Sequence, residues 1–320
     1  MTETIAPQAP TLDIWSNVSN DSPQQIDKRE KLSRKEFLHE YVLKNRPVIL
    51  KDATAGWAAV TKWTPAFFKE KYGSKRVPVF ERKRGVTLKD TVLFADYVDE
   101  ITASTYSNRA KYLFSLKIPK EFPELLADLE PRPTYWDPNW LESKYLLPGM
   151  PSFKLRNITG LEMNMGGTGS PFPFLHYDDL WTQTFIAQAY GRKEWLLWPP
   201  DQTPYMYASE QAENISDIPM ETDVDLSRFP LFGQARPVRC VVEQGEMLYG
   251  AAGWWHTTRA LTPSVAVVLS TANGSIWSDV TKAAFSRAWQ HPKWYVRPAA
   301  LPIAGYMTAF RAIKTITDPF

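Results

Sequence analysis

The order of apolar and polar positions divides most of the chain into two parts. In residues 26–152, segments whose apolar positions recur every three or four residues alternate with short apolar runs, as expected for helices alternating with strands. In residues 153–276, apolar and polar positions partly alternate in short runs separated by Pro or Gly, which is typical of antiparallel strands. The pattern therefore predicts an N-terminal α/β region followed by a mainly β domain.

Three further segments flank or interrupt these parts. Residues 1–25 are polar, contain proline and show no periodicity, which predicts a loose leader. Residues 201–236 carry turn residues and acids and form an insertion in the β domain. Residues 277–320 contain two helical segments, near 278–289 and 306–316, and we expect this helical tail either to cover one end of the barrel or to build the face of a homodimer.

Individual elements follow from the same pattern. In the N-terminal region, helices are expected at residues 27–43, 65–72, 87–101 and 119–129, strands at 46–50, 76–82 and 111–116, and an ordered loop region at 131–152. In the β domain, strands are expected at residues 157–165, 172–178, 183–189, 193–198, 237–242, 246–250, 253–259 and 264–271.

Composition narrows the classes of protein that remain. The 37 basic and 35 acidic side chains leave a net charge of +2, too small to favour nucleic acid or an anionic membrane as a partner. Cys240 is the single cysteine, which excludes an intrachain disulfide and a site with several thiolate ligands. A metal ion would therefore have to be held by His, Asp or Glu.

The first twenty residues do not resemble a signal peptide, because they contain Glu3 and Asp13, no Lys or Arg, and no continuous apolar run. The longest apolar run, at residues 265–269, is far shorter than the ~20 residues of a membrane-spanning helix. We therefore expect a cytoplasmic protein.

Candidate chemistry begins with His176 and Asp178, which stand two residues apart in an expected strand. Alternate side chains of a strand point to the same face, so this imidazole and this carboxylate can converge on one metal ion. The pair alone also fits an ordinary half-exposed strand with His and Asp at the surface.

His256 supplies the second imidazole, in the expected strand that begins with Gly253-Trp254-Trp255. A hydrogen-bonded core histidine between packing tryptophans is the alternative interpretation. The chain contains four histidines, and the other two, His39 in a charged helix and His291 in the tail, are expected to face solvent. Two imidazoles and one carboxylate on one face form the facial triad of non-haem Fe(II) oxygenases, which favours the metal site.

Four stretches of the β domain carry a specific combination of motifs: residues 176–178, 188–200, 245–246 and 253–256. Together they resemble the JmjC and cupin-like hydroxylases, the family of the asparaginyl hydroxylase that acts on hypoxia-inducible factor, and the segment 45–64 is similar to the entry segment of that family. The resemblance spans roughly residues 40–275. It implies a double-stranded β-helix of the cupin or jelly-roll type, with Fe(II) held by His176, Asp178 and His256 and with 2-oxoglutarate as cosubstrate.

The resemblance also implies residues that bind the cosubstrate. Lys193, in the family's G-x-K motif, would bind the distal carboxylate of 2-oxoglutarate, and Tyr112 would place its hydroxyl on the same group. Lys193 is notable in its own right, since a lysine between Trp195, Leu197 and Trp198 must either reach water or meet a buried anion. Thr184 stands where the family often has Asn.

The chain departs from the family's pattern at several points. Between Asp178 and Gly191 it is two residues longer than usual, which predicts a bulge or a longer turn near residues 179–182. Pro173-Phe174 replaces the usual Thr-Pro, and Val268 stands at a position that is often Asn. Part of the polar shell around the cosubstrate is therefore different.

Three functions are compatible with these residues. The first is hydroxylation of a protein or peptide side chain, with O₂ as the oxidant and a groove formed by the insertion and the N-terminal region. The second is a biosynthetic oxygenase that acts on a small molecule, which the changed polar shell favours. The third is a cupin that binds a metal without turnover.

Overall fold

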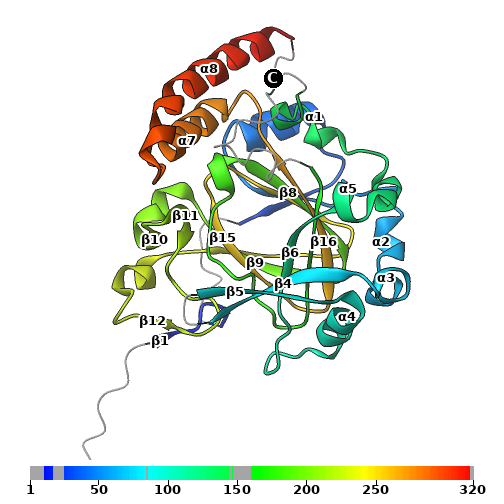
Figure 1. Ribbon diagram of the computed structural model, residues 1–320. Coiled ribbons are helices and arrows are strands. Elements are labelled where there is room, and N and C mark those ends of the chain that lie inside the picture. The colour runs from blue at the N-terminus through cyan, green and yellow to red at the C-terminus, as the bar shows by residue number, and fades with distance from the viewer. Residues whose placement is uncertain (1–10, 17–24, 84–85, 144–145, 147–159, 318–320) are drawn as a thin grey trace, which may run out of the picture.

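Two β-sheets face each other at the centre of the computed structural model, which describes residues 11–16, 25–83, 86–143, 146 and 160–317 (Figure 1). The larger sheet contains, in spatial order, β2 (Asp27–Arg29), β3 (Val48–Leu50), β14 (Met247–Gly250), β8 (Gln183–Tyr190), β16 (Ser264–Thr271), β7 (Glu162–Gly166) and β6 (Leu113–Lys117). The smaller sheet contains β13 (Val238–Val242), β9 (Lys193–Trp198) and β15 (Trp255–Ala260).

The chain winds back and forth between the two sheets. It passes from β8 in the larger sheet to β9 and β13 in the smaller one, then to β14, to β15 and to β16. This winding is that of a double-stranded β-helix, which confirms the predicted fold class, although the two sheets are not joined into a closed barrel. The predicted bounds of β9 agree with the structure, as do those of β16.

The strand predicted at residues 172–178 is wrong. The segment runs beside β15, with the Phe172 amide donating to the carbonyl of Thr258 at 2.7 Å, but only isolated bridges form. Pro171 and Pro173 lack an N–H group, so a continuous ladder cannot develop here. His176 is nevertheless held, because it forms an isolated bridge with His256.

Two of the predicted N-terminal helices are partly strands. Residues 27–29 form β2, which pairs in parallel with β3, and the helix begins only after Ser33, whose side chain forms a capping box with Glu36. It comprises α1 (Arg34–Phe37) and a π-helical turn (Leu38–Val42).

The helix predicted at residues 87–101 begins later than expected. Its first half is the exposed strand β5 (Val86–Leu93), which pairs along its length with β4 (Arg76–Lys83), and α4 (Phe94–Ala103) follows. Pairing with β4 therefore decides the conformation of β5, whose side chains bury little surface of their own.

Part of the predicted leader is ordered against the insertion. Strand β1 (Thr11–Leu12) pairs with β12 (Val224–Asp225), and Ile14 lies in an apolar cluster with Phe229 and Trp255. The loose leader is therefore wrong for residues 11–16, whereas residues 1–10 and 17–24 lie outside the described part. The insertion also contains 3₁₀ turns (Pro200–Tyr205 and Pro230–Gln234) and the strands β10 (Ala208–Ser209) and β11 (Ala212–Ser216).

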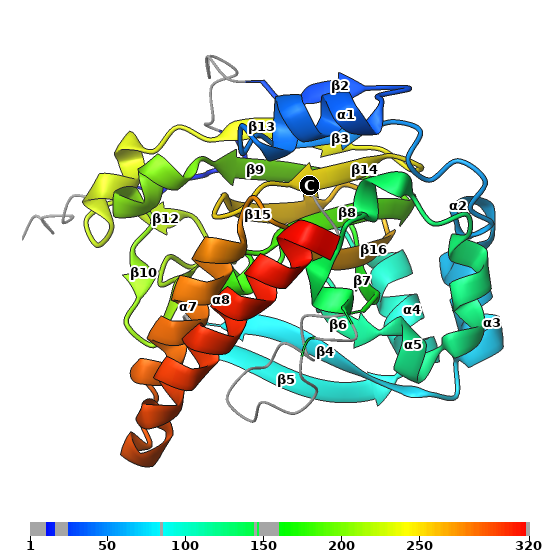
Figure 2. The same cartoon turned by 90° about the horizontal axis from the view of Figure 1, so that it is seen from above.

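Short helices and 3₁₀ segments follow the first strands of the chain, and Figure 2 shows α2 (Ala59–Lys62), α3 (Pro65–Tyr72) and α5 (Ile118–Glu121) together at one side of the sheets. The 3₁₀ segments are Pro123–Leu129, Thr134–Trp136 and Trp140–Glu142. The last two lie in the predicted loop region, of which residues 144–145 and 147–152 lie outside the described part. The strand predicted at residues 157–165 corresponds to β7, and its residues 157–159 also lie outside the described part.

The tail forms a helical hairpin over one end of the two sheets (Figures 1 and 2). It consists of α7 (Trp277–Trp289), a 3₁₀ segment (Trp294–Ala299) and α8 (Ala300–Thr317), so both predicted helices are present and α8 begins earlier than expected. None of the helices in the described ranges has the length and apolar character needed to cross a bilayer.

Candidate metal centre

His176, Asp178 and His256 come together between the two sheets. One nitrogen of each imidazole and a carboxylate oxygen of Asp178 lie within 4.8 Å of one another. The backbones of the two histidines exchange hydrogen bonds, at 3.1 Å from the His176 amide and 2.6 Å from the His256 amide, and their ring centres are 4.3 Å apart. The isolated bridge thus gives the convergence that a regular strand was expected to provide.

Both imidazoles direct Nδ1 toward a backbone carbonyl. Nδ1 of His256 lies 2.9 Å from the carbonyl oxygen of Trp254, and Nδ1 of His176 lies 3.4 Å from that of Phe174. Because a carbonyl only accepts, these contacts favour a proton on Nδ1 and leave the Nε2 lone pair for a metal. Burial, together with the neighbouring His256, lowers the pKa of His176 well below its usual value, so this imidazole is neutral at pH 7.

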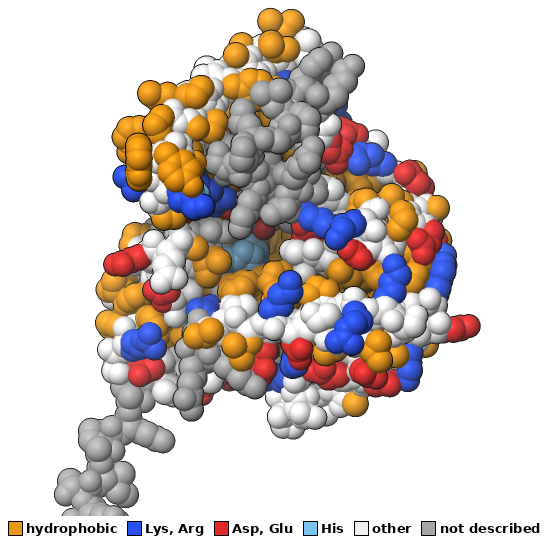
Figure 3. Space-filling view, viewed as in Figure 1, with side chains coloured by type: hydrophobic (Ala, Val, Ile, Leu, Met, Phe, Trp, Pro, Cys, Tyr) orange, Lys and Arg blue, Asp and Glu red, His pale blue; other side chains and the backbone are white. Residues whose placement is uncertain are grey.

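The three side chains face a cavity of about 230 Å³ between the sheets. Aromatic rings form one wall, and the ring of Phe172 stacks on the imidazole of His176 at 4.8 Å. In Figure 3, histidine atoms are visible at the bottom of a hollow that is bordered largely by apolar side chains. The site is therefore reached from this face of the molecule.

Lys193 lies in the same cavity and is 1% exposed. Its Nζ donates a hydrogen bond of 2.8 Å to the hydroxyl of Tyr112, and no carboxylate pairs with it among the described residues. Burial lowers the pKa of Lys193 to about 7. It is the single Lys or Arg among the described residues that line this cavity. The structure thus places a buried cation without an anionic partner opposite the three candidate metal ligands.

The register of the smaller sheet sets the distance between the candidate metal ligand His256 and Lys193. His256 on β15 pairs with Leu197 on β9, so Lys193 lies four residues further along the same face of the sheet. At about 3.3 Å per residue this separation is roughly 13 Å between backbones. Two side chains pointing into this interval leave room for a short dicarboxylate such as 2-oxoglutarate.

Thr184 and Val268 also line the cavity, from β8 and β16. The Thr184 hydroxyl is buried and has no hydrogen-bond partner within the described ranges. A buried polar atom without a partner is uncommon in a native protein, and it fits a site that awaits a polar ligand. The residues present therefore fit both a divalent metal and a dicarboxylate.

Comparison with known proteins agrees with this geometry. Residues 33–269 match the model of the family described as "Cupin-like domain". The chain belongs to this family. The match agrees with the double-stranded β-helix of the structure, and the resemblance to JmjC and cupin-like oxygenases is confirmed.

Several curated proteins are similar to the cupin-like domain of this chain. The lysine-specific demethylase JMJ30 of Arabidopsis thaliana is 28% identical over 247 residues, which cover 76% of this chain and 54% of the demethylase. The 2-oxoglutarate and iron-dependent oxygenase JMJD4 of Gallus gallus is 26% identical over 270 residues, covering 78% of this chain and 60% of the relative.

A human relative, the bifunctional peptidase and (3S)-lysyl hydroxylase JMJD7, is 26% identical over 270 residues, covering 72% of this chain and 78% of its own length. The chain spans only a little more than half the length of JMJ30 and JMJD4.

Two contacts of the site were missed from the sequence, although the insertion was expected to form part of a groove. Asn214 and Ile215 of β11 line the cavity, and Ile215 forms an isolated bridge with His176, so part of the insertion is a wall of the site. Asp179 also lines the cavity and is bound by Arg287 of α7. Nothing in the spacing of the residues signals either contact, because 108 positions separate Asp179 from Arg287.

The buried lysine is expected to reduce the stability of the ligand-free protein. Its pKa is about 7 in the folded chain and 10.5 in the unfolded one, so between these values the unfolded chain binds more protons and stability rises with pH. Lys193→Met should raise the free energy of unfolding at pH 7 by about 1–3 kcal/mol, after the loss of the Tyr112 hydrogen bond is deducted. Thermal unfolding should show a Tm several degrees higher.

The increase in the free energy of unfolding should become smaller as the pH approaches 10, because Lys193 is then neutral in the folded chain and increasingly neutral in the unfolded chain. Lys69→Met, at an exposed ion pair with Asp99, is the matched control and should change Tm little. A Tm of Lys193→Met that is lower than that of the wild type at pH 7 would contradict the role of burial at this position.

Proposed function

We propose that this chain is an Fe(II)- and 2-oxoglutarate-dependent oxygenase that hydroxylates a side chain of a protein or peptide. The observation that carries the proposal is one cavity with His176, Asp178 and His256 on one side and, on the other, Lys193, which pairs with no carboxylate in the described part of the chain. Membership of the cupin-like domain family and the similarity to JMJD4 support it.

Each side chain has a distinct task in this proposal. His176, Asp178 and His256 hold the metal and leave one side of it open, as in other sites with two histidines and one carboxylate. Lys193, assisted by the Tyr112 hydroxyl, binds and orients the distal carboxylate of the cosubstrate through a charge-assisted hydrogen bond.

When bound, Fe(II) would activate O₂, and 2-oxoglutarate and the substrate C–H bond would each supply two electrons to it: one oxygen atom would enter the C–H bond and the other would enter succinate, with loss of CO₂. Phe172, stacked on His176, and the buried Trp195 keep water away from this region of the cavity. The protein's contribution is therefore positioning and exclusion of solvent.

The hollow in the surface above the site supports a protein or peptide as substrate, because a side chain can enter while its backbone stays outside (Figure 3). The description of JMJD7 as a lysyl hydroxylase points in the same direction. The rival, an oxygenase acting on a small molecule, is favoured by the departures from the family's pattern at Pro173, Thr184 and Val268, of which Thr184 and Val268 line the cavity.

The test is conversion of 2-oxoglutarate to succinate by metal-stripped protein to which Fe(II) is restored. Succinate should form with Fe(II) and O₂, and should be absent with a chelator or with Zn(II) in place of Fe(II). No succinate under any condition would leave only a metal-binding cupin. Mass spectrometry of a peptide library after incubation would then separate the two oxygenase classes, since a peptide substrate gains one oxygen atom.

A homodimer through the C-terminal hairpin and a cytoplasmic location both stay predictions. The dimer is supported by apolar side chains that the hairpin exposes, visible in Figure 3 along its outer face. They include Trp289, Trp294, Tyr295, Leu301, Ile313 and Ile316.

A further inference from the structure

The turn that follows Asp178 is bound by the C-terminal helix α7. Arg287 of α7 donates from Nη1 to Oδ2 of Asp179 at 2.8 Å and from Nη2 to Oδ1, so the pair is bidentate. Asp179 is adjacent to the proposed ligand Asp178 and lines the same cavity. The carboxylate raises the pKa of Arg287 further, so the guanidinium stays charged. A planar fork of this kind fixes direction as well as distance.

The backbone of this turn has an uncommon conformation. Leu180 and Trp181 have φ angles of +55° and +58°, a region that residues with a Cβ atom seldom adopt. The turn is closed by Thr182, whose amide and hydroxyl both donate to the carbonyl of Asp179. Such a conformation persists only where its surroundings hold it in place. It is the turn that the spacing between Asp178 and Gly191 predicted.

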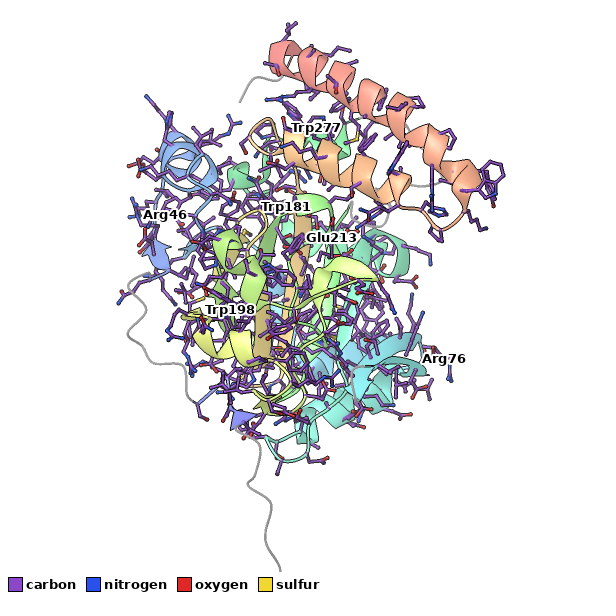
Figure 4. The ribbon with its side chains drawn as sticks, turned by 90° about the vertical axis from the view of Figure 1, so that its left-hand side faces the viewer. Arg46, Arg76, Trp181, Trp198, Glu213 and Trp277 are labelled. Atoms are coloured by element: carbon purple, nitrogen blue, oxygen red, sulfur yellow. The ribbon has the colours of Figure 1, made fainter. Side chains whose placement is uncertain are left out.

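The surroundings that hold the turn come from α7 and from the strand of the second histidine. Leu180 is buried in an apolar cluster with Ile276 and Trp277, and Figure 4 shows Trp181 and Trp277 on the side of the sheets next to α7. The Trp181 ring lies over Gly253, where a Cβ atom would be 2.3 Å from the ring. The turn is thus packed between the C-terminal hairpin and the segment that leads to His256.

We propose that Arg287 is a positioning residue for the metal centre, and this inference rests on the proposed function. By fixing Asp179 it sets the backbone from which the Asp178 carboxylate points to the metal. Partners that orient a metal ligand change metal affinity by about 10- to 100-fold when they are removed. The family match ends at residue 269, so α7 contributes to the site from outside the matched region.

The competing interpretation is that the ion pair between Arg287 and Asp179 only attaches α7 to the core. The two interpretations predict different metal affinities for the folded variants. An attachment role would lower Tm without changing the affinity of the folded protein for metal, whereas a positioning role weakens metal binding even where folding is intact.

The experiment titrates the metal-free, full-length chain with Co(II) and follows its visible absorption. Arg287→Met should bind Co(II) about 10- to 100-fold more weakly than the wild type, with an altered spectrum, and Arg287→Lys should restore part of the affinity. Lys282→Met is the matched control, because Lys282 lies on the same helix in an exposed pair with Asp279 at 3.1 Å. It should bind Co(II) as the wild type does.

Asp179→Asn provides a second variant should Arg287→Met fail to fold. The double variant Asp179→Asn/Arg287→Met should be no weaker than the poorer single variant, because both remove the same contact. Wild-type affinity in every folded variant at these two positions, or equal weakening in Lys282→Met, would overturn the inference while leaving the proposed function intact. A wild-type chain that takes up no Co(II), or an unchanged titration in His176→Ala, would overturn both.

Discussion

Replacing His176 by alanine is expected to reduce Fe(II)-dependent consumption of 2-oxoglutarate to the background level. Partners of metal ligands already change affinity by about 10- to 100-fold, so removal of a ligand should cost more than about 100-fold. The fold should survive, since the side chain faces the cavity and the hydrogen bonds to His256 are made by the backbone. Succinate formation and Co(II) uptake, measured on the same preparation, check this result.

His39→Ala is the matched control, because His39 is exposed on the N-terminal helical segment, away from the cavity. It should retain wild-type turnover. Full activity in His176→Ala would mean that the three side chains converge without binding the catalytic metal, and the assignment of His256 and Asp178 would fail with it.

Lys193→Met should raise the KM for 2-oxoglutarate by about 10- to 100-fold, since a hydrogen bond to a charged group contributes about 1.5–3 kcal/mol. The effect should lie mainly in KM, because the lysine contacts the end of the cosubstrate that does not react. Steady-state succinate formation over a range of 2-oxoglutarate concentrations checks the split between KM and kcat.

The dependence on pH gives an independent check. Because the pKa of Lys193 is about 7, the fraction of charged lysine in the ligand-free protein falls as the pH rises above 7. The wild-type KM should therefore increase from pH 7 to 9, whereas that of Lys193→Met should stay flat. Arg192→Met, at an exposed pair with Glu243, is the control. A KM for 2-oxoglutarate in Lys193→Met equal to that of the wild type would mean that the distal carboxylate of the cosubstrate does not bind at Lys193.

The strands of the β domain were largely predictable because short apolar runs in the sequence indicate which segments are buried. In β9, every position is buried, and the run Trp195-Leu196-Leu197-Trp198 is apolar throughout. The chemistry of the site was equally visible, since few residue types can hold a metal without thiolates, and only four histidines were available. The turn expected near residues 179–182 is present, as a 3₁₀ turn at Asp179–Trp181.

The errors arose where pairing with another strand decides the conformation. Residues 27–29 form a strand because β3 lies beside them, and residues 86–93 form one because they make a hairpin with the preceding strand β4. Pro171 and Pro173 broke the expected ladder, although the convergence it was meant to explain still occurs through backbone bonds to β15. The apolar periodicity of one segment does not show which strand it will pair with.

The hairpin of α7 and α8 has a practical consequence for anyone who wishes to shorten this protein. A version trimmed at residue 269, where the family match ends, would retain every proposed ligand and Lys193. It would also uncover Leu180 and lose the guanidinium that holds Asp179. Such a fragment would contain the three proposed ligands and Lys193, but the turn after Asp178 would be held less firmly. Its inactivity would therefore not contradict the assignment of these residues.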